Sequence, residues 1–478
     1  MLILFACGEN ENYKQNNSFP DIYPDYINIF IPYNIAPLNF MIRENCDKIE
    51  VEIKGKYGEL RTNGKFKISF PLKEFSDLLS QNKGDTLLVE VKARINGKLL
   101  KYKSFYWYVS SEAIDSYLTY RLIEPGYEVW SKINISQRNI SNFDETILAD
   151  NNLTEGSCMN CHVGSKQNPQ KSFFHLRGPK GGTVIVDGEK LRKLNTKPDG
   201  AYANAIYGNW HPSGRFIGFS TNVVLPAMHT IHDKRAMVYD TKSDLIVVDI
   251  STDEILTSPL ISRPDRFETF PEFSSDGKKM FFCVADSVTL PANYQKLHYN
   301  LCSIDFNEKE RTFGSKIDTL VNSQKISKTV SEPKASPDGK YLVYTSFNYG
   351  TFPIWHPEAK LYCYNLLTGQ IDTMPELNNN LNYSNSYHSW SSNSRWLVFA
   401  SKRDNGMYGK PYFSYIDKNG KANKPFVLPQ EDPEFYDYTY KSFNIPELFE
   451  QARLFDAFDI ERLYKDEGSL EKLKYLEK

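Results

Sequence analysis

The chain lacks any apolar run near the ~20 residues that a membrane-spanning helix needs, which excludes an integral membrane protein of that kind. It also lacks a charge excess, because 57 Lys and Arg residues stand against 59 Asp and Glu residues, for a net charge of −2. Such a balance gives no electrostatic basis for binding nucleic acid or an anionic membrane. No Gly-x-Ser-x-Gly elbow, Walker loop or dinucleotide fingerprint occurs, so the common motif-based enzyme classes find no support.

Cysteine is also scarce, since seven residues in 478 are too few for a disulfide scaffold. Cys283, Cys302 and Cys363 lie in strand-like sequences, which predicts free thiols buried in a core. A Cys283–Cys302 bridge between neighbouring strands is the alternative for an exported chain. Aromatic residues, in contrast, reach 14%, and they favour strands over helices. The composition is that of a strand-rich globular protein of roughly three domains, or of one large fold with appendages.

Residues 1–19 combine a short apolar stretch with a polar tether. The apolar part ends in Leu4-Phe5-Ala6-Cys7, and an Asn- and Glu-rich segment follows it directly. This pattern resembles the lipobox of bacterial lipoproteins, in which the cysteine is lipidated. The resemblance implies lipidation at Cys7 and a lipid anchor at the periplasmic or outer-membrane face of a Gram-negative cell envelope. The stretch is shorter than a usual signal and carries no basic residue before it, so a frayed apolar terminus is the alternative.

Residues 20–115 predict a small β-sandwich-like domain. Apolar and polar residues alternate over 49–53 and 89–95, as they do in half-buried strands. The dipeptides Tyr57-Gly58, Asn63-Gly64 and Asn96-Gly97 separate these strands from their neighbours. Asn-Gly between alternating runs is the strongest short-range signal for a hairpin, so an antiparallel arrangement is expected.

A repeated strand–turn–strand unit marks residues 201–435. Its anchor residues are 63, 62 and 55 positions apart, and the third copy carries the turn sequence Ser336-Pro-Asp-Gly-Lys340. The four anchors are Gly214, Gly277, Gly339 and Ser394. A unit of about four strands that cannot bury its faces alone predicts an all-β fold, the β-propeller. Six blades is the best count, with the linking segment 116–200 supplying one or two blades that the repeat does not mark.

These repeats are similar to the WD40-like (PD40) repeats of TolB and related cell-envelope propellers, over roughly 200–430. The longer stretch 120–445, in which a haem-type motif precedes the propeller, resembles TolB-like lipoproteins that carry a c-type haem motif. A more distant resemblance is to the propeller subunit of hydrazine synthase. The resemblance implies a six-bladed envelope lipoprotein that works with an envelope protein or a redox partner.

The motif that carries chemistry is Cys158-Met-Asn-Cys161-His162, within the segment 116–200. Two thiols at this spacing add to the two vinyl groups of one haem c, and the adjacent imidazole becomes an axial ligand of the iron. The pattern therefore predicts a covalent haem at Cys158 and Cys161, with His162 as the metal ligand. His175, which follows two phenylalanines, is the nearest candidate for the second axial position. A disulfide, a thiol redox pair or a metal site are the alternatives.

Other histidines and the tail carry weaker patterns. His229 and His232 have i, i+3 spacing on an expected long loop, where they are candidate metal or haem ligands or part of a solvated loop. Three further histidines adjoin the repeats and are expected to serve their turns: His211, His356 and His388. Residues 436–478 are expected to form a short helical tail, since apolar residues from Pro446 to Leu463 recur at helical spacing.

Two functions of different classes follow. The first is an envelope protein with one haem c, which acts in electron transfer or small-molecule redox chemistry. The second is a non-redox binding module, whose channel mouth or loops recognise a protein, peptide or glycan partner and whose cysteine pair is structural. No catalytic residue is assigned, and the sequence alone does not decide whether the protein is an enzyme.

Overall fold

The computed structural model describes residues 13–124, 131–228, 236–379 and 382–476. The chain divides into two compact units. Unit 1 takes in the chain up to residue 113 with residues 141–143 and 426–439, and unit 2 takes in residues 114–140, 144–425 and 440–478. Strands dominate both units, so the predicted all-β class is confirmed. Among the described residues, no helix is both long and apolar enough to cross a membrane.

Unit 1 contains a seven-stranded and a three-stranded sheet around a buried tryptophan, Trp107. The larger sheet comprises β1 (Lys14–Gln15), β3 (Ile29–Pro32), β5 (Cys46–Lys54), β6 (Glu59–Gly64), β8 (Thr86–Ile95), β9 (Lys98–Lys101) and β10 (Phe105–Ser110). The smaller comprises β2 (Ile22–Tyr23), β4 (Phe40–Ile42) and β7 (Lys67–Ile68). Asn96 and Gly97 both adopt positive φ in the β8–β9 hairpin, as the Asn-Gly signal predicts.

One helix of unit 1 has no counterpart in the sequence-based predictions. Helix α1 (Leu72–Gln81) buries Phe75, Leu78 and Leu79, and the Phe75 ring lies 6.1 Å from that of Trp107. Unit 1 also includes the short elements β33 (Phe426–Val427) and α4 (Phe435–Tyr438). The first domain therefore includes a helix and a later chain segment, besides the predicted sheets.

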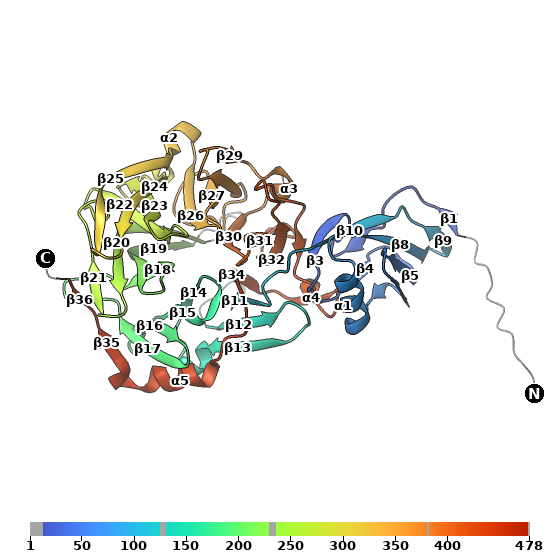
Figure 1. The fold of residues 1–478 in the computed structure, drawn as a ribbon, viewed down its shortest axis with the longest axis horizontal. Helices are drawn as coiled ribbons and strands as arrows, with labels where there is room; N and C mark the ends of the chain where they lie inside the picture. The colour runs from blue at the N-terminus through green and yellow to red at the C-terminus, as the bar shows by residue number, and fades with distance from the viewer. Residues whose placement is uncertain (1–12, 125–130, 229–235, 380–381, 477–478) are drawn as a thin grey trace, which may run out of the picture. The chain divides into compact units, whose positions relative to one another are not determined.

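Unit 2 consists of successive antiparallel sheets, which Figure 1 shows side by side around a common centre. Sheets 1 and 2 comprise β11 (Tyr117–Ile123), β12 (Ile133–Asn139), β13 (Glu145–Asp150) and β34 (Ser442–Phe449), then β14 (Met159–Ser165), β15 (Asn168–Leu176), β16 (Gly182–Asp187) and β17 (Lys190–Asn195). Sheets 3 and 4 comprise β18 (Ala205–Trp210), β19 (Phe216–Met228), β20 (Ala236–Asp249) and β21 (Glu254–Leu256), then β22 (Arg266–Phe273), β23 (Lys279–Asp286), β24 (Asn300–Asn307) and β25 (Thr312–Val321). Sheets 5 and 6 comprise β26 (Thr329–Ala335), β27 (Tyr341–Phe347), β28 (Lys360–Asn365) and β29 (Ile371–Asp372), then β30 (Asn385–Trp390), β31 (Trp396–Ser401) and β32 (Lys410–Tyr415).

Short elements complete unit 2. The C-terminal strands β35 (Leu470–Lys472) and β36 (Lys474–Tyr475) add to the outer edges of sheets 2 and 3. The helical pieces are η2 (Asn151–Thr154), η4 (Tyr294–Lys296), α2 (Ser323–Ile326), α3 (Pro375–Asn378), α5 (Ala457–Lys465) and η5 (Glu467–Ser469). The segment 116–200 thus supplies β11, β12 and β13 of sheet 1 and β14 to β17 of sheet 2.

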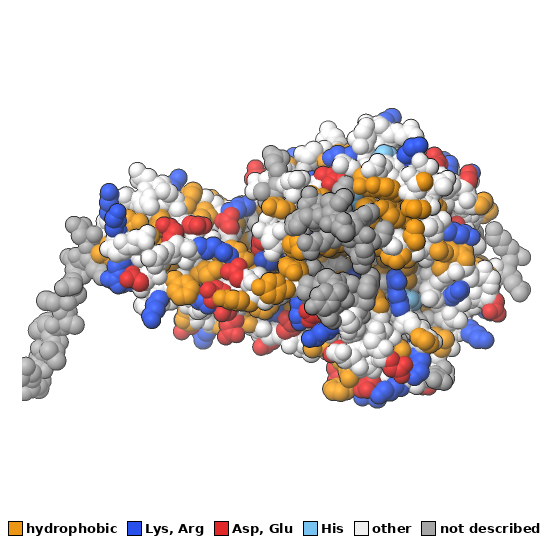
Figure 2. All heavy atoms as spheres, turned by 180° about the vertical axis from the view of Figure 1, so that it is seen from behind, with side chains coloured by type: hydrophobic (Ala, Val, Ile, Leu, Met, Phe, Trp, Pro, Cys, Tyr) orange, Lys and Arg blue, Asp and Glu red, His pale blue; other side chains and the backbone are white. Residues whose placement is uncertain are grey.

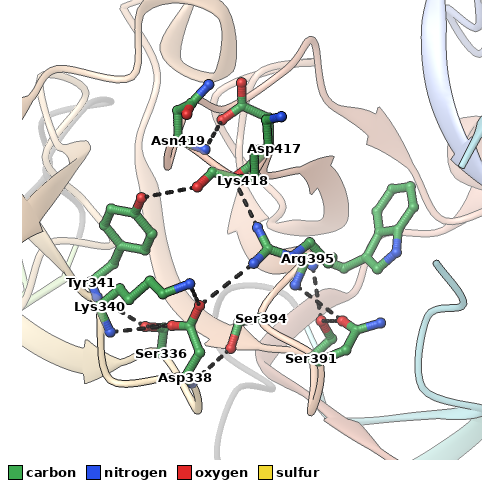
Figure 3. Close-up of polar contacts among 12 residues, drawn as sticks. Ser336, Asp338, Lys340, Tyr341, Ser391, Ser394, Arg395, Asp417, Lys418 and Asn419 are labelled. Atoms are coloured by element: carbon green, nitrogen blue, oxygen red, sulfur yellow. Dashed lines mark hydrogen bonds and ion pairs between the residues drawn. The ribbon is translucent and has the colours of Figure 1, made fainter. Parts of the chain in front are cut away.

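The predicted repeat turns are present and share one hydrogen-bond pattern. In the turn of sheet 5, the Ser336 hydroxyl donates to Asp338 (2.7 Å) and accepts from the Tyr341 N–H (3.0 Å), as Figure 3 shows. Gly339 in this turn has a φ of 72°. The turn of sheet 6 repeats it, because the Ser391 hydroxyl accepts from the Trp396 N–H (2.9 Å). The Ser394 hydroxyl then accepts the Asp338 N–H (3.0 Å), which joins the two turns. The serine hydroxyl and the residue with positive φ both lie within the turn, so the local sequence is sufficient to predict it.

The first strand of each sheet in space, here called the inner strand, contacts the inner strands of its neighbours. These strands are β34, β14, β18, β22, β26 and β30, and β34 contacts both β30 and β14. Two tryptophans tie them together: the indole N–H of Trp210 donates to the Val163 carbonyl (3.2 Å), and that of Trp390 donates to the Lys334 carbonyl (3.1 Å). Apolar clusters fill the space between successive sheets, for example Ile135 with Phe174 between sheets 1 and 2. Unit 2 is therefore propeller-like.

Two expectations about the fold are corrected. Residues 442–449 form the inner strand of sheet 1 instead of the start of a helix, and only 457–465 are helical. Cys283 and Cys302 are free and lie in different apolar clusters on opposite faces of sheet 4, so they form no bridge. For the cysteines, the alternation of strands, which places neighbouring residues on opposite faces, decides the outcome.

Candidate functional site

Each inner strand is interrupted by a β-bulge whose first residue has a φ between 45° and 56°. These bulge residues are Cys161, Tyr207, Phe270, Glu332, Tyr387 and Ile445. Their backbone conformation is uncommon for residues other than glycine, and bulges re-aim side chains and often lie next to functional sites. The second cysteine of the CxxCH motif is thus the bulge residue of sheet 2.

The motif residues face different surroundings. Cys158 is half-buried and packs against the apolar cluster between sheets 1 and 2. Cys161 is buried beside Tyr207 and Tyr387, and this burial raises the pKa of its thiol. A buried thiol with a raised pKa is a poor nucleophile, which disfavours a thiol redox pair. Both cysteines are free thiols in the structure.

His162 is fully enclosed on the side of sheet 2 that faces sheet 1. Burial, with the charges of Arg453 and Arg121, holds the pKa of its imidazole well below the usual range, and the carbonyls of Ile445 and Thr119 adjoin the ring. A covalent haem needs both thiols and the imidazole to face one open space. Here Cys161 adjoins Tyr207 and Tyr387, whereas His162 faces sheet 1, so the motif as folded does not present its groups to one haem c.

His175 does not join His162. It pairs across the sheet with Asn160, and its Nδ1 lies 3.1 Å from the Thr183 hydroxyl, on the side of sheet 2 that faces sheet 3. Burial lowers the pKa of His175 to about 3. Because the two histidines lie on opposite faces of one sheet, this fold does not bring His175 and His162 together at one iron.

The remaining histidine predictions divide into two groups. His211 contacts the Gly277 carbonyl through Nε2 (3.0 Å), His388 contacts the Val343 carbonyl through Nε2 (2.9 Å), and His356 contacts Glu358 through Nδ1 (2.9 Å). The first two tie a turn or an inner strand to the neighbouring sheet, which is the structural role expected. His229 and His232 lie outside the described residues, as does Cys7. In the described part of the chain, no three His, Cys, Asp or Glu residues are grouped to hold a metal ion.

The clearest site for a ligand is a pocket of about 320 Å³ that all of the inner strands line, here called the axial pocket. Its polar ring consists of residues two positions after a bulge residue in five sheets: Asn209, Glu272, Lys334, Ser389 and Glu447. The bulges therefore place these side chains at one level around a common space. Sequence reasoning missed this ring, although Pro271-Glu272, Pro333-Lys334 and Pro446-Glu447 repeat a proline followed by a charged residue.

Two carboxyl groups give the axial pocket its chemistry. Glu272 accepts the Ala335 N–H (3.1 Å) and the Asn209 side-chain amide, and it lies 3.6 Å from the Lys334 ammonium. Glu447 accepts the Gly164 N–H with both oxygens (3.1 Å each). Burial raises the pKa of each carboxyl to about 7, against the opposing effect of Lys334. Near neutral pH, both groups therefore exchange between a form that only accepts hydrogen bonds and a form that also donates.

The raised pKa of a buried carboxyl can be tested at the bulge residue Glu332. It accepts the Tyr387 N–H (2.9 Å), and burial raises its pKa to about 7. An unfolded glutamate titrates near ~4.3, so the stability that Glu332 contributes is complete below that pH and is lost as the pH rises through about 7. The unfolding free energy of the unmutated protein should therefore fall between pH 5.5 and 8.5. We expect this fall to be smaller by about 2 kcal/mol in Glu332→Gln.

Urea denaturation at the two pH values measures this difference. The surface variant Glu461→Gln is the matched control, because Glu461 only pairs with Lys465 on helix α5. The unfolding free energy of Glu461→Gln should fall with rising pH as much as that of the unmutated protein. An equally steep fall in Glu332→Gln would contradict a raised pKa at this position.

No protein-family model and no curated protein matches the chain. Among solved structures, it is similar to an oligogalacturonate lyase in complex with manganese, with 13% identity over 66% of this chain and 74% of that one and a TM-score of 0.36. It is also similar to prolyl oligopeptidase B from Galerina marginata, with 10% identity, coverage of 83% and 55%, and a TM-score of 0.34. A DUF4784 family protein from Bacteroides caccae has 9% identity, coverage of 87% and 98%, and a TM-score of 0.34. Values this low transfer no function.

Surface charge adds no further class of ligand. Figure 2 shows acidic and basic side chains interspersed over the face drawn there, without a continuous area of one sign. This distribution agrees with the net charge of −2. Recognition by long-range electrostatics is therefore not indicated for this face, and the axial pocket remains the candidate site.

Proposed function

We propose that unit 2 is a closed six-bladed, TolB-like propeller and that it is a non-redox binding module with its ligand site in the axial pocket. The contacts of β34 with the inner strands of sheets 6 and 2 support closure, because β34 lies near the C-terminal end of unit 2 and pairs with β11, the first strand of unit 2. The polar ring supports the site, since several sheets aim polar side chains into one space. Ligand sites are concave and have few, convergent polar groups.

The ligand that fits these groups best is the terminal sugar of a glycan. A hydroxyl both donates and accepts hydrogen bonds, and the carboxyls of Glu272 and Glu447, with pKa values of about 7, match either role near neutral pH. Lys334 and Asn209 add donors at the same level. At about 320 Å³, the pocket is at the small end of the ~300–1,000 Å³ range of ligand pockets, which favours one sugar unit over a folded partner.

Binding to an array of neutral and amino oligosaccharides tests this function. We expect at least one glycan to bind, and we expect Lys334→Met to weaken that binding at least tenfold, since about 1.4 kcal/mol is a factor of ten. The indoles of Trp210 and Trp390 line the pocket, so their fluorescence reports occupancy in solution. The control Glu461→Gln, on helix α5, should bind as the unmutated chain does. Binding that is unchanged in Lys334→Met, or absent for every glycan, would refute the proposal.

We also propose lipidation at Cys7 and a place in the cell envelope, which rest on the lipobox-like sequence alone. The alternative function, a haem c protein with electron-transfer or small-molecule redox activity, makes the competing prediction. In that case, protein from a host that matures cytochromes c would have visible absorption that survives denaturation. Replacement of Cys158 and Cys161 by alanine would abolish that absorption. A coloured protein would therefore overturn the non-redox assignment.

A further inference from the structure

A basic cluster, buried except for the half-buried Arg121, lies between sheets 1 and 2, and the proposed binding function does not use it. It consists of Thr119, Arg121, His162 and Arg453. Thr119 and Arg121 are two residues apart on β11, so both face sheet 2, and Arg121 donates from Nη1 to the Met159 carbonyl on β14 (3.1 Å). His162 faces them from sheet 2.

Arg453 comes from the segment after β34. Its backbone N–H donates to the side chain of Gln137 on β12 (2.9 Å), and its guanidinium carbon lies 4.1 Å from the centre of the Phe449 ring. The residue is only 4% exposed. A guanidinium that stacks on a ring keeps its N–H bonds in its own plane, directed past the ring edge. The cation therefore has its flat face covered and its donors free for another group.

Apart from Nη1 of Arg121, most polar side-chain atoms of the cluster have no hydrogen-bond partner among the described residues. Within the described chain, no group hydrogen-bonds Nε, Nη1 or Nη2 of Arg453, Nε of Arg121, either ring nitrogen of His162 or the hydroxyl of Thr119. The acid that acts on Arg453 is Glu447, which already accepts the Gly164 N–H. A buried guanidinium without hydrogen bonds is destabilising, so these donors favour a bound group that accepts them.

We propose that the basic cluster binds a small oxyanion, such as inorganic phosphate or sulfate, between sheets 1 and 2. The fork of an arginine matches two oxygens of an oxyanion at once, and a second arginine, an imidazole N–H and a hydroxyl supply further donors. Two positive charges disfavour a metal cation at the same place. The anion joins the segment after β34 to strands from sheets 1 and 2, and it gives His162 a role that needs no haem.

Anion counting tests the proposal on the full-length protein. Ion chromatography of acid-denatured protein measures phosphate and sulfate retained through purification, and equilibrium dialysis against phosphate measures the remaining capacity. We expect the two to sum to one anion per chain. Phosphate should also raise the Tm relative to sodium chloride at equal ionic strength, because a ligand that binds only the folded state stabilises it.

Two arginine variants locate the site. Arg453→Met keeps the length of the side chain and removes its charge, and it should lower phosphate affinity at least tenfold. Arg462→Met is the control, because Arg462 is 72% exposed on helix α5 and should bind phosphate as the unmutated chain does. Unchanged binding by Arg453→Met would overturn the proposal. Absence of a retained or exchangeable oxyanion in the unmutated protein, or equal stabilisation by chloride, would also overturn it, whether or not the variant folds.

Discussion

A chain that ends at residue 441 is expected to lose the cooperative unfolding transition of unit 2. The truncation removes β34, which pairs with β11 along its whole length and completes sheet 1. It also exposes Tyr120, whose ring lies 4.9 Å from that of Phe443, and removes Phe449 from its place against Gly164. Each sheet is stabilised by packing against its two neighbours, so the loss of β34 weakens two sheet–sheet interfaces at once. The total free energy of unfolding of a domain is only about 5–15 kcal/mol.

Calorimetry and urea denaturation of the two truncated chains measure this effect. A chain that ends at residue 468 is the control, since it loses the edge strands β35 and β36 and the end of η5 but keeps β34 and helix α5. We expect it to unfold cooperatively with a modest loss of stability. If the chain ending at 441 unfolds with the same midpoint as the control, β34 does not close the ring.

Replacement of Trp390 by alanine is expected to lower the free energy of unfolding by about 3–5 kcal/mol. The side chain is 2% exposed, and its indole N–H donates to the Lys334 carbonyl of the neighbouring inner strand. The substitution therefore leaves a cavity and also an unpaired carbonyl. Trp390→Phe keeps most of the volume but not the hydrogen bond, so its cost should be nearer the ~1–3 kcal/mol of one buried unpaired group.

The control for Trp390 is Phe458→Ala. Phe458 is 59% exposed on helix α5, so its loss should cost less than about 0.5 kcal/mol. Urea denaturation followed by far-ultraviolet circular dichroism gives the three free energies. A cost below about 1 kcal/mol for Trp390→Ala would show that the inner strands of sheets 5 and 6 do not depend on this contact.

The sequence predicts those parts of the fold that local chemistry determines. A serine, an aspartate and a residue with positive φ close the turn at Ser336 without help from distant residues, which is why the repeat was visible. The pairing of β34 with β11 joins residues more than 300 positions apart, and no local signal records it. Both faces of β34 are covered, so the neighbouring residues Leu448 and Phe449 are both buried, and the strand lacks the alternation that would have marked it.

The candidate site was harder to predict for a related reason. The CxxCH spacing is local and indicates haem. In the fold, however, Cys158 precedes β14 and Cys161 lies within it, while His162 on β14 and His175 on β15 lie on opposite faces of the sheet. The polar ring is assembled from residues that are distant in sequence. Its members share only their position after a bulge, and a φ near 50° at Tyr207 or Phe270 leaves no mark on composition. Only the repeated proline and charged residue could have revealed it.

The outer edges of the sheets have a consequence for self-association. An unpaired edge strand is a template on which a second copy can add, and this is a common route to aggregation. Here β35 and β36 cover the edges of β17 and β21 with parallel pairs. Strand β29 is only two residues long, and β25 presents the charges of Lys316 and Asp318 to solvent. Strands β35 and β36 thus protect the edges of sheets 2 and 3 against pairing with a second copy, whereas sheets 4 and 5 are protected by charged side chains and by a short edge strand.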